Sequence, residues 1–293
     1  MSKIRICFFA DGVSVHTQRW LREMVSRNFE VTLITRRPWS CPGVQVVTLA
    51  GSWGALEWFR RVSEIRRIVR ELRPDIVHGH YITSYGFWAA ISGVRPLVLT
   101  AWGSDILVSP KQNRLVRWLT KWSLSRADLI TADSLDTLEE IRTYSPPGRL
   151  EQVQWGVDLD RIHPNMDRTH SVLDVISLRS WERNYNINLV LKSFAGLLQE
   201  MPGLSAHLHL LGGGEQESAL KKQASALGIA EQVTFHGLVN EPTLLEMMAQ
   251  ADISISVPTS DATAMSLLES MAAGLPVVVS DLPANRQWVD AAG

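Results

Sequence analysis

The sequence predicts an α/β protein built from two doubly wound, Rossmann-like parallel sheets. Short apolar segments alternate with helical segments along the whole chain of 293 residues. The apolar segments are continuous rather than alternating in polarity, which is typical of strands buried on both faces of a parallel sheet. The pattern restarts after a stretch rich in proline and glycine, so one sheet is expected in each half of the chain.

Strands and helices alternate through the first half. Strands are expected over residues 4–9, 30–35, 44–50, 75–80, 96–102 and 128–133. Helices are expected near 17–28, 55–72 and 112–125, with a short helix after residue 80 and another from about residue 134. Residues 1–150 are assigned to a first domain. The stretch that follows lacks helical periodicity, so 151–168 is expected to be a linker.

The second half repeats the alternation in residues 169–293. Strands are expected over 171–178, 206–212, 232–237, 253–258 and 276–281, and helices over 186–200, 215–227, 241–250 and 265–273. The second domain is expected to be incomplete, because residues 282–293 follow a strand with no completed helix. Two such domains are expected to face each other across a cleft, with the carboxyl ends of their strands toward it.

The composition excludes several classes of protein. Apolar residues make up 45% and charged residues 20% of the chain, which is unlike a disordered or fibrous protein. No stretch approaches the roughly 18 consecutive apolar residues of a membrane-spanning helix. The apolar run before Asp11 is too short for a secretory signal, and Cys7 and Cys41 cannot frame a disulfide scaffold. A cytoplasmic location is the default expectation.

The charge is divided unevenly along the chain. Residues 1–150 hold 21 lysine and arginine residues against 13 acidic ones, whereas residues 151–293 hold 8 against 17. Basic residues and tryptophan share the predicted helices 57–73 and 113–126, which suits an anionic membrane surface. The alternative is that each helix packs its apolar side on its own sheet. Nucleic acid is not expected as a partner, because no motif combines basic and aromatic residues in a groove.

Segment 258–281 carries the clearest chemical signal. A polar loop meets a helix that is expected to begin near Ala264, and the N–H groups and dipole of such a helix end favour an anion. Glu269 follows within this helix, and its neighbours in the sequence are apolar. A carboxylate in such surroundings needs hydrogen-bond donors, which a sugar diol can supply. The alternative is a solvated or paired glutamate on a polar stripe. Asp261 in the loop is expected to face the same pocket, or else to cap the helix.

These residues resemble a known family. Asp261-x7-Glu269, followed by SMAAGLPVVVSD, is similar to the acidic-x7-acidic signature of retaining glycosyltransferases of family 4, which have the GT-B fold. The segments WGVDLDRIHP, HLLGGGEQESALKKQASALGIAEQVTFHGLV and ADGVSVHTQRWLREMVSRNFEVTLIT are also similar to segments of that family, in the same order. Relative to the family, the chain looks truncated at its C-terminus.

The resemblance implies an enzyme that moves a sugar from a UDP- or GDP-linked donor to an acceptor hydroxyl with retention of configuration. The acceptor would be a sugar, a lipid-linked intermediate or a polysaccharide, and the product would serve polysaccharide or glycolipid synthesis. The protein would be cytoplasmic, either free or peripheral on the inner face of the membrane. No cofactor or metal is expected beyond the nucleotide-sugar co-substrate.

The resemblance also implies roles for individual residues. Glu269 would hold the ribose hydroxyls, and Asp261 would contact the donor sugar. Arg179 would neutralise the diphosphate, since a guanidinium stabilises charge that develops on an anionic leaving group. The other donor-side positions are the backbone of Thr263, Ala264 and Met265, and Gly237 beside the base.

The sequence departs from the family at several positions. The family places a lysine about five residues after the arginine, but residues 180–185 contain none, and Arg183 is the candidate replacement. The family has a glycine-rich first loop, whereas this sequence has a single glycine there, Gly12. Trp102 stands where many members have histidine.

In the first half, acceptor-side candidates follow the strands. They are Gly12, His16 and Gly103, and Asp105 is a catalytic candidate expected to face the cleft together with Asp11 and His80. His16 is more commonly a helix-start residue than a catalytic one. The pair His78-x-His80 is expected to be structural rather than a metal site.

Two other functions stay open at this level. A nucleotide-binding module without catalysis would bind nucleotide without turnover. A GT-B sugar-nucleotide epimerase would form product without an acceptor.

Overall fold

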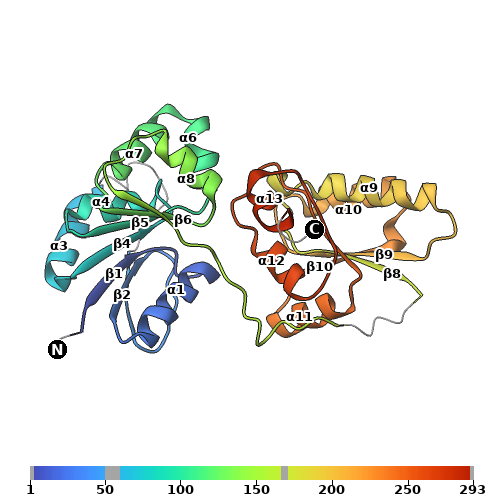
Figure 1. Cartoon of the computed structure of the whole chain (residues 1–293), viewed down its shortest axis with the longest axis horizontal. Helices are drawn as coiled ribbons and strands as arrows, with labels where there is room; N and C mark the ends of the chain where they lie inside the picture. Colours follow the sequence, from blue (N-terminus) through green and yellow to red (C-terminus); the bar gives the residue numbers. More distant parts are fainter. Residues whose placement is uncertain (1–2, 50–59, 166–170, 291–293) are drawn as a thin grey trace. The chain divides into compact units, whose positions relative to one another are not determined.

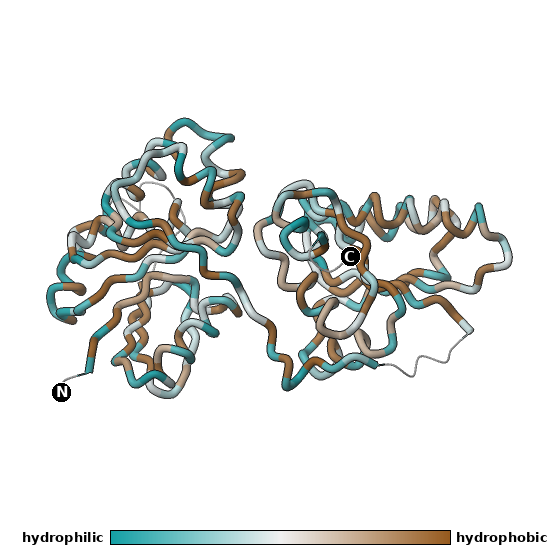
Figure 2. The backbone as a smooth tube through the Cα atoms, viewed as in Figure 1, coloured by the Kyte–Doolittle hydropathy of each residue, from teal (hydrophilic) through white to brown (hydrophobic). Residues whose placement is uncertain are grey.

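The computed structural model describes residues 3–49, 60–165 and 171–290, and the chain divides after Gln154 into two compact units. Each unit is one parallel sheet covered by helices on both faces (Figure 1). Hydrophobic residues run along the strands in both units, as the brown segments of Figure 2 show. Among the described residues, no helix is long and apolar enough to cross a lipid bilayer.

The first unit contains a seven-stranded sheet in the order β3-β2-β1-β4-β5-β6-β7. Its strands are β1 (Arg5–Phe9), β2 (Glu30–Thr35), β3 (Val44–Thr48), β4 (Ile76–His80), β5 (Leu97–Thr100), β6 (Leu129–Ala132) and β7 (Arg149–Gln152). The six strands predicted in this half are confirmed. The start of the linker at 151 is wrong, because Glu151 and Gln152 lie in β7 and pair with β6. This strand was missed because its sequence, RLEQ, has no apolar run.

Helices cover both faces of this sheet. Helix α1 (Val15–Ser26) packs on one face, where Leu21 meets Phe8 and Leu33. The larger core on the other face includes Ile65, Trp88 and residues of helices α3 (Val62–Leu72), α4 (Tyr85–Ser92), α7 (Arg114–Leu124) and α8 (Leu135–Arg142). The short helices α5 (Ser104–Leu107) and α6 (Ser109–Gln112) follow β5. The predicted helix 55–72 is confirmed over α3, and residues 55–59 lie outside the described residues.

The second unit contains a five-stranded sheet in the order β10-β9-β8-β11-β12. Its strands are β8 (Leu173–Ser177), β9 (Ala206–Leu211), β10 (Val233–Gly237), β11 (Ile253–Ser256) and β12 (Val277–Val279). Helices α9 (Ile187–Glu200) and α10 (Glu217–Ala226) contribute to the core on one face, and α11 (Glu241–Gln250) to the core on the other. Helix α12 (Met265–Ala272) follows β11 and contacts β11 and β12. All five strands and four helices predicted here are confirmed.

The expectation that no completed helix follows residue 281 is wrong. Helix α13 (Pro283–Val289) begins with proline in its first turn, a position where the missing N–H costs nothing. Asn285 is buried and donates from Nδ2 to the carbonyl of Ser280, 2.8 Å away, which ties the helix to the end of β12.

The strand orders place one topological switch point in each sheet. The chain runs outward from β1 to β2 on one side and from β4 to β5 on the other, and β8 and β11 divide the second sheet in the same way. Open α/β sheets bind their ligands at the carboxyl ends of the two strands that flank this point. The residues that follow β1, β4, β8 and β11 are therefore the places to search for function.

Candidate functional site

An ion pair lies at the switch point of the second sheet. Arg179 follows β8, and Asp261 lies in the loop after β11; Nη2 of the arginine is 2.6 Å from Oδ2 of the aspartate. The same guanidinium donates from Nη1 to Oγ of Ser266, 2.9 Å away, and its Cζ lies 4.3 Å from the centre of the Tyr185 ring. Arg179 is 8% exposed, so the structure places a cation, an anion, a hydroxyl and an aromatic ring in one shielded site.

Burial dominates the electrostatics of Asp261. Desolvation raises the pKa of this carboxyl, while the Arg179 charge and hydrogen bonds from Arg179 and the N–H of Ala262 oppose the rise. That backbone hydrogen bond is 3.0 Å long. Both Arg179 and Asp261 were expected near the donor, but their pairing was not predicted.

Two asparagines fasten the segment after β8 to the loop after β11. The side chain of Asn184 donates to the Ser260 carbonyl at 2.8 Å and accepts from the Ser260 N–H at 3.2 Å. Asn186 donates to the Val257 carbonyl at 2.9 Å. Neither residue was predicted from the sequence, although a side-chain amide can donate and accept at once and so can pair with both groups of a peptide backbone. Asn184 stands five residues after Arg179, at the position where the family was expected to have lysine. The proposed replacement, Arg183, is exposed in the short 3₁₀ helix η1 (Arg183–Tyr185).

A glycine loop after β9 lies against the same segment. A Cβ on Gly212 would lie 2.4 Å from the carbonyl oxygen of Arg179, and one on Gly214 would lie 2.5 Å from that of Trp181. The N–H of Trp181 donates to the Gly213 carbonyl at 2.9 Å. Only glycine permits this approach of two backbones, which sets the position of Arg179.

Gly237 ends β10 beside this loop. Its carbonyl accepts from the Gly212 N–H at 2.9 Å, and its φ of +73° is in the region that favours glycine. Gly237 thus lies at the carboxyl end of β10, beside the glycine loop. The contact with a base stays a prediction.

The start of α12 completes this edge of the second sheet. Thr263 and Ala264 are buried, and α12 begins at Met265 without a side-chain cap from Ala264. Glu269 lies one turn into the helix and is half-buried between buried Leu268 and Ser270. This position at the boundary between core and surface agrees with the apolar neighbours of Glu269 in the sequence. The binding of a ribose by Glu269 stays a prediction.

The first unit gathers aromatic and imidazole rings at its own switch point. His16, at the start of α1, stacks edge-to-face on Trp102 with ring centres 5.3 Å apart, and Trp102 lies 5.4 Å from His80. Burial lowers the pKa of His16 to about 4, so this ring is neutral at pH 7. Two of the expected acceptor-side residues shape the nearby loops. Gly12 donates its N–H to Oγ1 of Thr35, and Gly103 has a φ of +89° before α5.

The structure corrects the expected exposure of His80 and supports a structural reading of His78. His80 was expected to point toward the cleft, but it is 1% exposed and packs against Phe8 and Trp20 under α1. Nε2 of His78 lies 2.7 Å from Oγ1 of Thr100, and burial lowers the pKa of His78 to about 3. The described part of the chain holds no group of three or more His, Cys, Asp or Glu side chains arranged for a metal ion.

The expectation that Asp105 faces an open cleft is wrong. Its side chain is fully buried, and its two oxygens accept from the backbone N–H groups of Ile82 at 2.6 Å and Trp102 at 2.9 Å. The carboxylate thereby joins the segments that follow β4 and β5. Burial raises the pKa of Asp105 to about 6.

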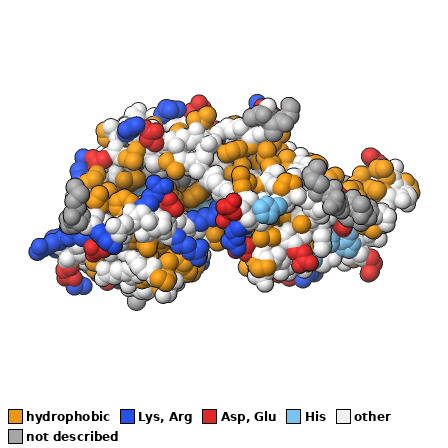
Figure 3. All heavy atoms as spheres, turned by 60° about the horizontal axis from the view of Figure 1, so that its bottom comes forward, with side chains coloured by type: hydrophobic (Ala, Val, Ile, Leu, Met, Phe, Trp, Pro, Cys, Tyr) orange, Lys and Arg blue, Asp and Glu red, His pale blue; other side chains and the backbone are white. Residues whose placement is uncertain are grey.

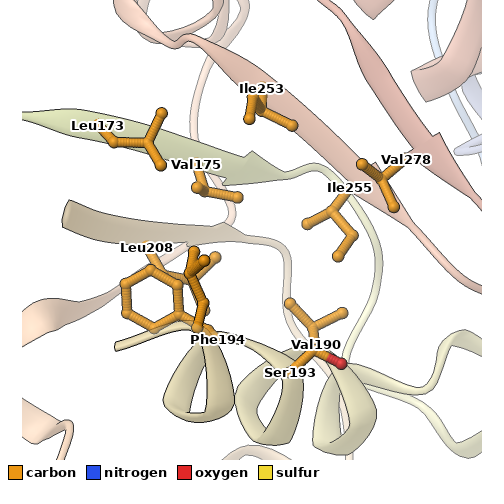
Figure 4. Close-up of a pocket in the computed structure, with 10 residues that line it drawn as sticks. Leu173, Val175, Val190, Ser193, Phe194, Leu208, Ile253, Ile255 and Val278 are labelled. Atoms are coloured by element: carbon orange, nitrogen blue, oxygen red, sulfur yellow. The ribbon is translucent and has the colours of Figure 1, made fainter. Parts of the chain in front are cut away.

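An apolar hollow of about 140 Å³ lies between α9 and one face of the second sheet (Figure 4). Its lining is hydrophobic except for Ser193, with Phe194, Val190 and Val278 at its walls. Such a surface offers no group to recognise a charged nucleotide. The candidate site of the second unit is therefore the Arg179–Asp261 pair with the surrounding loops.

Solved structures with the same architecture identify the class of fold. Sucrose-phosphate synthase from Thermosynechococcus elongatus superposes on this chain with a TM-score of 0.80 and 14% sequence identity. The match covers 98% of this chain and 83% of that chain. Anabaena HepE, solved in complex with UDP and glucose, gives a TM-score of 0.77 at 16% identity, with 98% of this chain and 83% of that chain covered. The protein has the GT-B fold of two Rossmann-like domains.

The family follows from the sequence. Family models described as "Glycosyl transferase 4-like" and "Glycosyl transferases group 1" match residues 5–134 and 162–292. The chain belongs to the family 4 type of GT-B glycosyltransferases. It is 24% identical to N-acetyl-alpha-D-glucosaminyl L-malate synthase of Bacillus anthracis and 24% identical to alpha-monoglucosyldiacylglycerol synthase of Streptococcus pneumoniae. The alignments include 74% and 77% of this chain but only 59% and 56% of those relatives.

The close approach of the glycine loop to the segment after β8 can be tested within the loop itself. Gly214→Ala is expected to lower the unfolding free energy by about 1–3 kcal/mol, because the new methyl group overlaps the Trp181 backbone. Gly213→Ala is the matched control, since its nearest neighbour is Leu238 at 3.6 Å, and a change within about 0.5 kcal/mol is expected. Denaturant unfolding of both variants measures the difference, and equal values would contradict this packing.

The burial of Asp105 predicts a pH dependence. Its pKa is raised from 3.8 to about 6, so in this interval the folded protein retains a proton that the unfolded chain loses. The unfolding free energy of the wild type should therefore fall as the pH rises through this interval, relative to that of Asp105→Asn, by up to about 3 kcal/mol. Denaturant titrations of the two proteins over this pH range measure the effect. A difference that does not vary with pH would show that Asp105 is not buried in this way.

Proposed function

We propose that the protein transfers a sugar from a UDP- or GDP-linked donor to an acceptor hydroxyl with retention of anomeric configuration. The observation that carries this proposal is the shielded Arg179 at the switch point of the second sheet. A guanidinium in a site of low dielectric stabilises the negative charge that develops on a departing diphosphate. HepE, a structural neighbour, has been solved with UDP and with UDP-glucose, which supports a donor of this class.

We assign the remaining donor contacts by the resemblance to the family. The Glu269 carboxylate accepts hydrogen bonds from the ribose hydroxyls, and Gly237 borders the base. The backbone of Thr263, Ala264 and Met265 meets sugar hydroxyls and phosphate at the start of α12, where the helix dipole favours an anion. In a retaining transfer on one face of the sugar, the C–O bond to the diphosphate breaks as the acceptor oxygen bonds to the anomeric carbon. The acceptor proton passes to the departing phosphate oxygen. Arg179, rather than a metal ion, supplies the compensating charge in this proposal.

The acceptor belongs to the first unit in this proposal, beside Gly12, His16 and Gly103. A sugar, lipid-linked or polysaccharide acceptor fits a role in polysaccharide or glycolipid synthesis. One relative is an alpha-monoglucosyldiacylglycerol synthase, and the similar structure of WaaG is described as involved in lipopolysaccharide biosynthesis. A cytoplasmic enzyme at the inner face of the membrane would meet such acceptors.

Helix α7 supports contact with an anionic membrane. Leu115 is 55% and Trp118 58% exposed, while Leu119 and Trp122 of the same helix pack against the core. Three exposed cations lie along the helix with the two exposed apolar side chains: Arg114, Arg117 and Lys121. In Figure 3, blue Lys and Arg side chains are more frequent over the first unit, on the left, than over the second. Helix α3 offers a weaker case, because its apolar residues Ile65 and Val69 are buried on its own sheet.

The donor proposal predicts nucleotide binding that depends on Glu269. UDP or GDP should bind to the wild type and about 10- to 100-fold more weakly to Glu269→Gln, because the loss of hydrogen bonds to a charged acceptor costs about 1.5–3 kcal/mol. Glu246→Gln, at an exposed position on α11, makes the same charge change and should bind like the wild type. Isothermal titration calorimetry gives the affinities. Release of nucleoside diphosphate from UDP- and GDP-sugars in the presence of candidate acceptors tests the transfer, and equal affinities of the two variants would refute the role of Glu269.

The membrane proposal predicts binding to anionic vesicles. Phosphatidylglycerol vesicles should bind the wild type and bind Arg114→Gln/Arg117→Gln/Lys121→Gln much more weakly, since each cation near an anionic surface contributes about 1 kcal/mol. Lys192→Gln/Lys221→Gln/Lys222→Gln, in the second unit, is the charge-matched control. Co-sedimentation with phosphatidylglycerol and with phosphatidylcholine vesicles compares them. Equal binding of both triple variants would exclude α7 as the membrane contact.

A further inference from the structure

Arg179 faces two different kinds of partner at its site. Ser266 and Tyr185 are neutral and hold the guanidinium by a hydrogen bond of 2.9 Å and by stacking at 4.3 Å. Asp261 is charged and lies 2.6 Å from Nη2. We propose that Asp261 is a built-in counter-anion, which neutralises Arg179 in the unliganded protein and competes with the diphosphate for it. This inference rests on the proposed donor site and assigns Asp261 a role in donor and product affinity.

Burial makes this competition strong. The Arg179 side chain is 9% and the Asp261 side chain 17% exposed, so water screens their charges poorly. A cation so far removed from water needs a compensating anion, and Asp261 supplies it within the same unit. An incoming diphosphate brings a second anion to a guanidinium that already has one. The two anions repel each other, and this repulsion weakens the binding of any diphosphate.

The neutral partners allow the counter-anion to change while the cation stays in place. Tyr185 lies in η1, and its segment is fastened by Asn184 to the Ser260 backbone. Ser266 lies in the first turn of α12. The guanidinium is therefore held by two elements that do not depend on Asp261. After transfer, the same carboxylate is available to take the place of the departing diphosphate, which favours product release.

Two other acidic side chains lie near Arg179 and Asp261 in the sequence. Glu182 is exposed, so solvent screens its charge. Glu269 is half-buried on α12, one turn beyond Ser266. Among the ion pairs of the described residues, Arg179 pairs with Asp261.

Removal of the aspartate charge should therefore strengthen anion binding. Asp261→Asn is expected to bind inorganic pyrophosphate about tenfold more tightly than the wild type, a magnitude ordinary for coupling between two ligands. Pyrophosphate is the probe because it has no ribose or base, so its affinity reports on the anion site alone. Asp281→Asn is the matched control: Asp281 also pairs with an arginine of the second unit, Arg286, but at an exposed position. Its pyrophosphate affinity should equal that of the wild type.

A double variant shows whether the gain passes through Arg179. Arg179→Gln/Asp261→Asn should bind pyrophosphate no more tightly than Arg179→Gln alone. Isothermal titration calorimetry measures all five proteins, and thermal unfolding establishes that each is folded. Asp261→Ser, which keeps a side-chain oxygen, serves as the second neutral variant if Asp261→Asn does not fold.

The outcomes separate this inference from the proposed function. Equal or weaker pyrophosphate binding by the neutral variants of Asp261 overturns the counter-anion role, whether or not the wild type binds UDP or GDP. A gain that persists in the Arg179→Gln background also overturns it. Failure of Glu269→Gln to change nucleotide affinity refutes the ribose site and leaves the pyrophosphate result standing.

Discussion

The shielded cation at the end of β8 is the constraint on which the rest of the second unit depends. A guanidinium with 8% exposure is costly unless its charge and its N–H groups are satisfied. Asp261 provides the charge, Ser266 a hydroxyl and Tyr185 a ring face. They come from the loop after β11, from α12 and from η1, respectively. The loops at this switch point are therefore organised around one side chain, as expected of a site prepared for an anion.

Close backbone contacts connect the Arg179 segment to the loops that follow the neighbouring strands. The glycine loop after β9 lies so close to Arg179 and Trp181 that a Cβ at Gly212 or Gly214 would overlap their carbonyl oxygens. The Asn184 amide fixes the other side by pairing with both the N–H and the carbonyl of Ser260. Such a site has little freedom to rearrange, which favours recognition of a rigid, charged group over a flexible apolar one. The first unit has a different character at its switch point, where neutral imidazoles pack among tryptophan rings. Its ion pair there, between Asp11 after β1 and Arg37 after β2, leaves the arginine side chain 56% exposed, unlike the shielded Arg179.

The fold was largely predictable from the sequence, because the strands that form the two sheet interiors are continuous apolar runs. Strand β7 was missed because RLEQ lies at the sheet edge and needs no apolar run, and α13 because its seven residues are too few for a clear period. The site was predictable in part. Arg179 and Asp261 stood out by resemblance, but their pairing depends on a contact across 82 residues that no local pattern reveals. Asp105 and Asp261 both follow strands in polar loops, but their partners differ. Asp105 is bound by backbone N–H groups, whereas Asp261 pairs with an arginine.

The central claim is that Arg179 exists to bind the diphosphate of a nucleotide donor, and its replacement tests that claim most directly. Calorimetric titration of UDP and GDP into the wild type and into Arg179→Gln, both shown to be folded, compares the two affinities. The account predicts measurable binding to the wild type, weakened by at least about tenfold in the variant, since a lost charge-assisted hydrogen bond costs about 1.5–3 kcal/mol. Binding of the same strength to both proteins would contradict it.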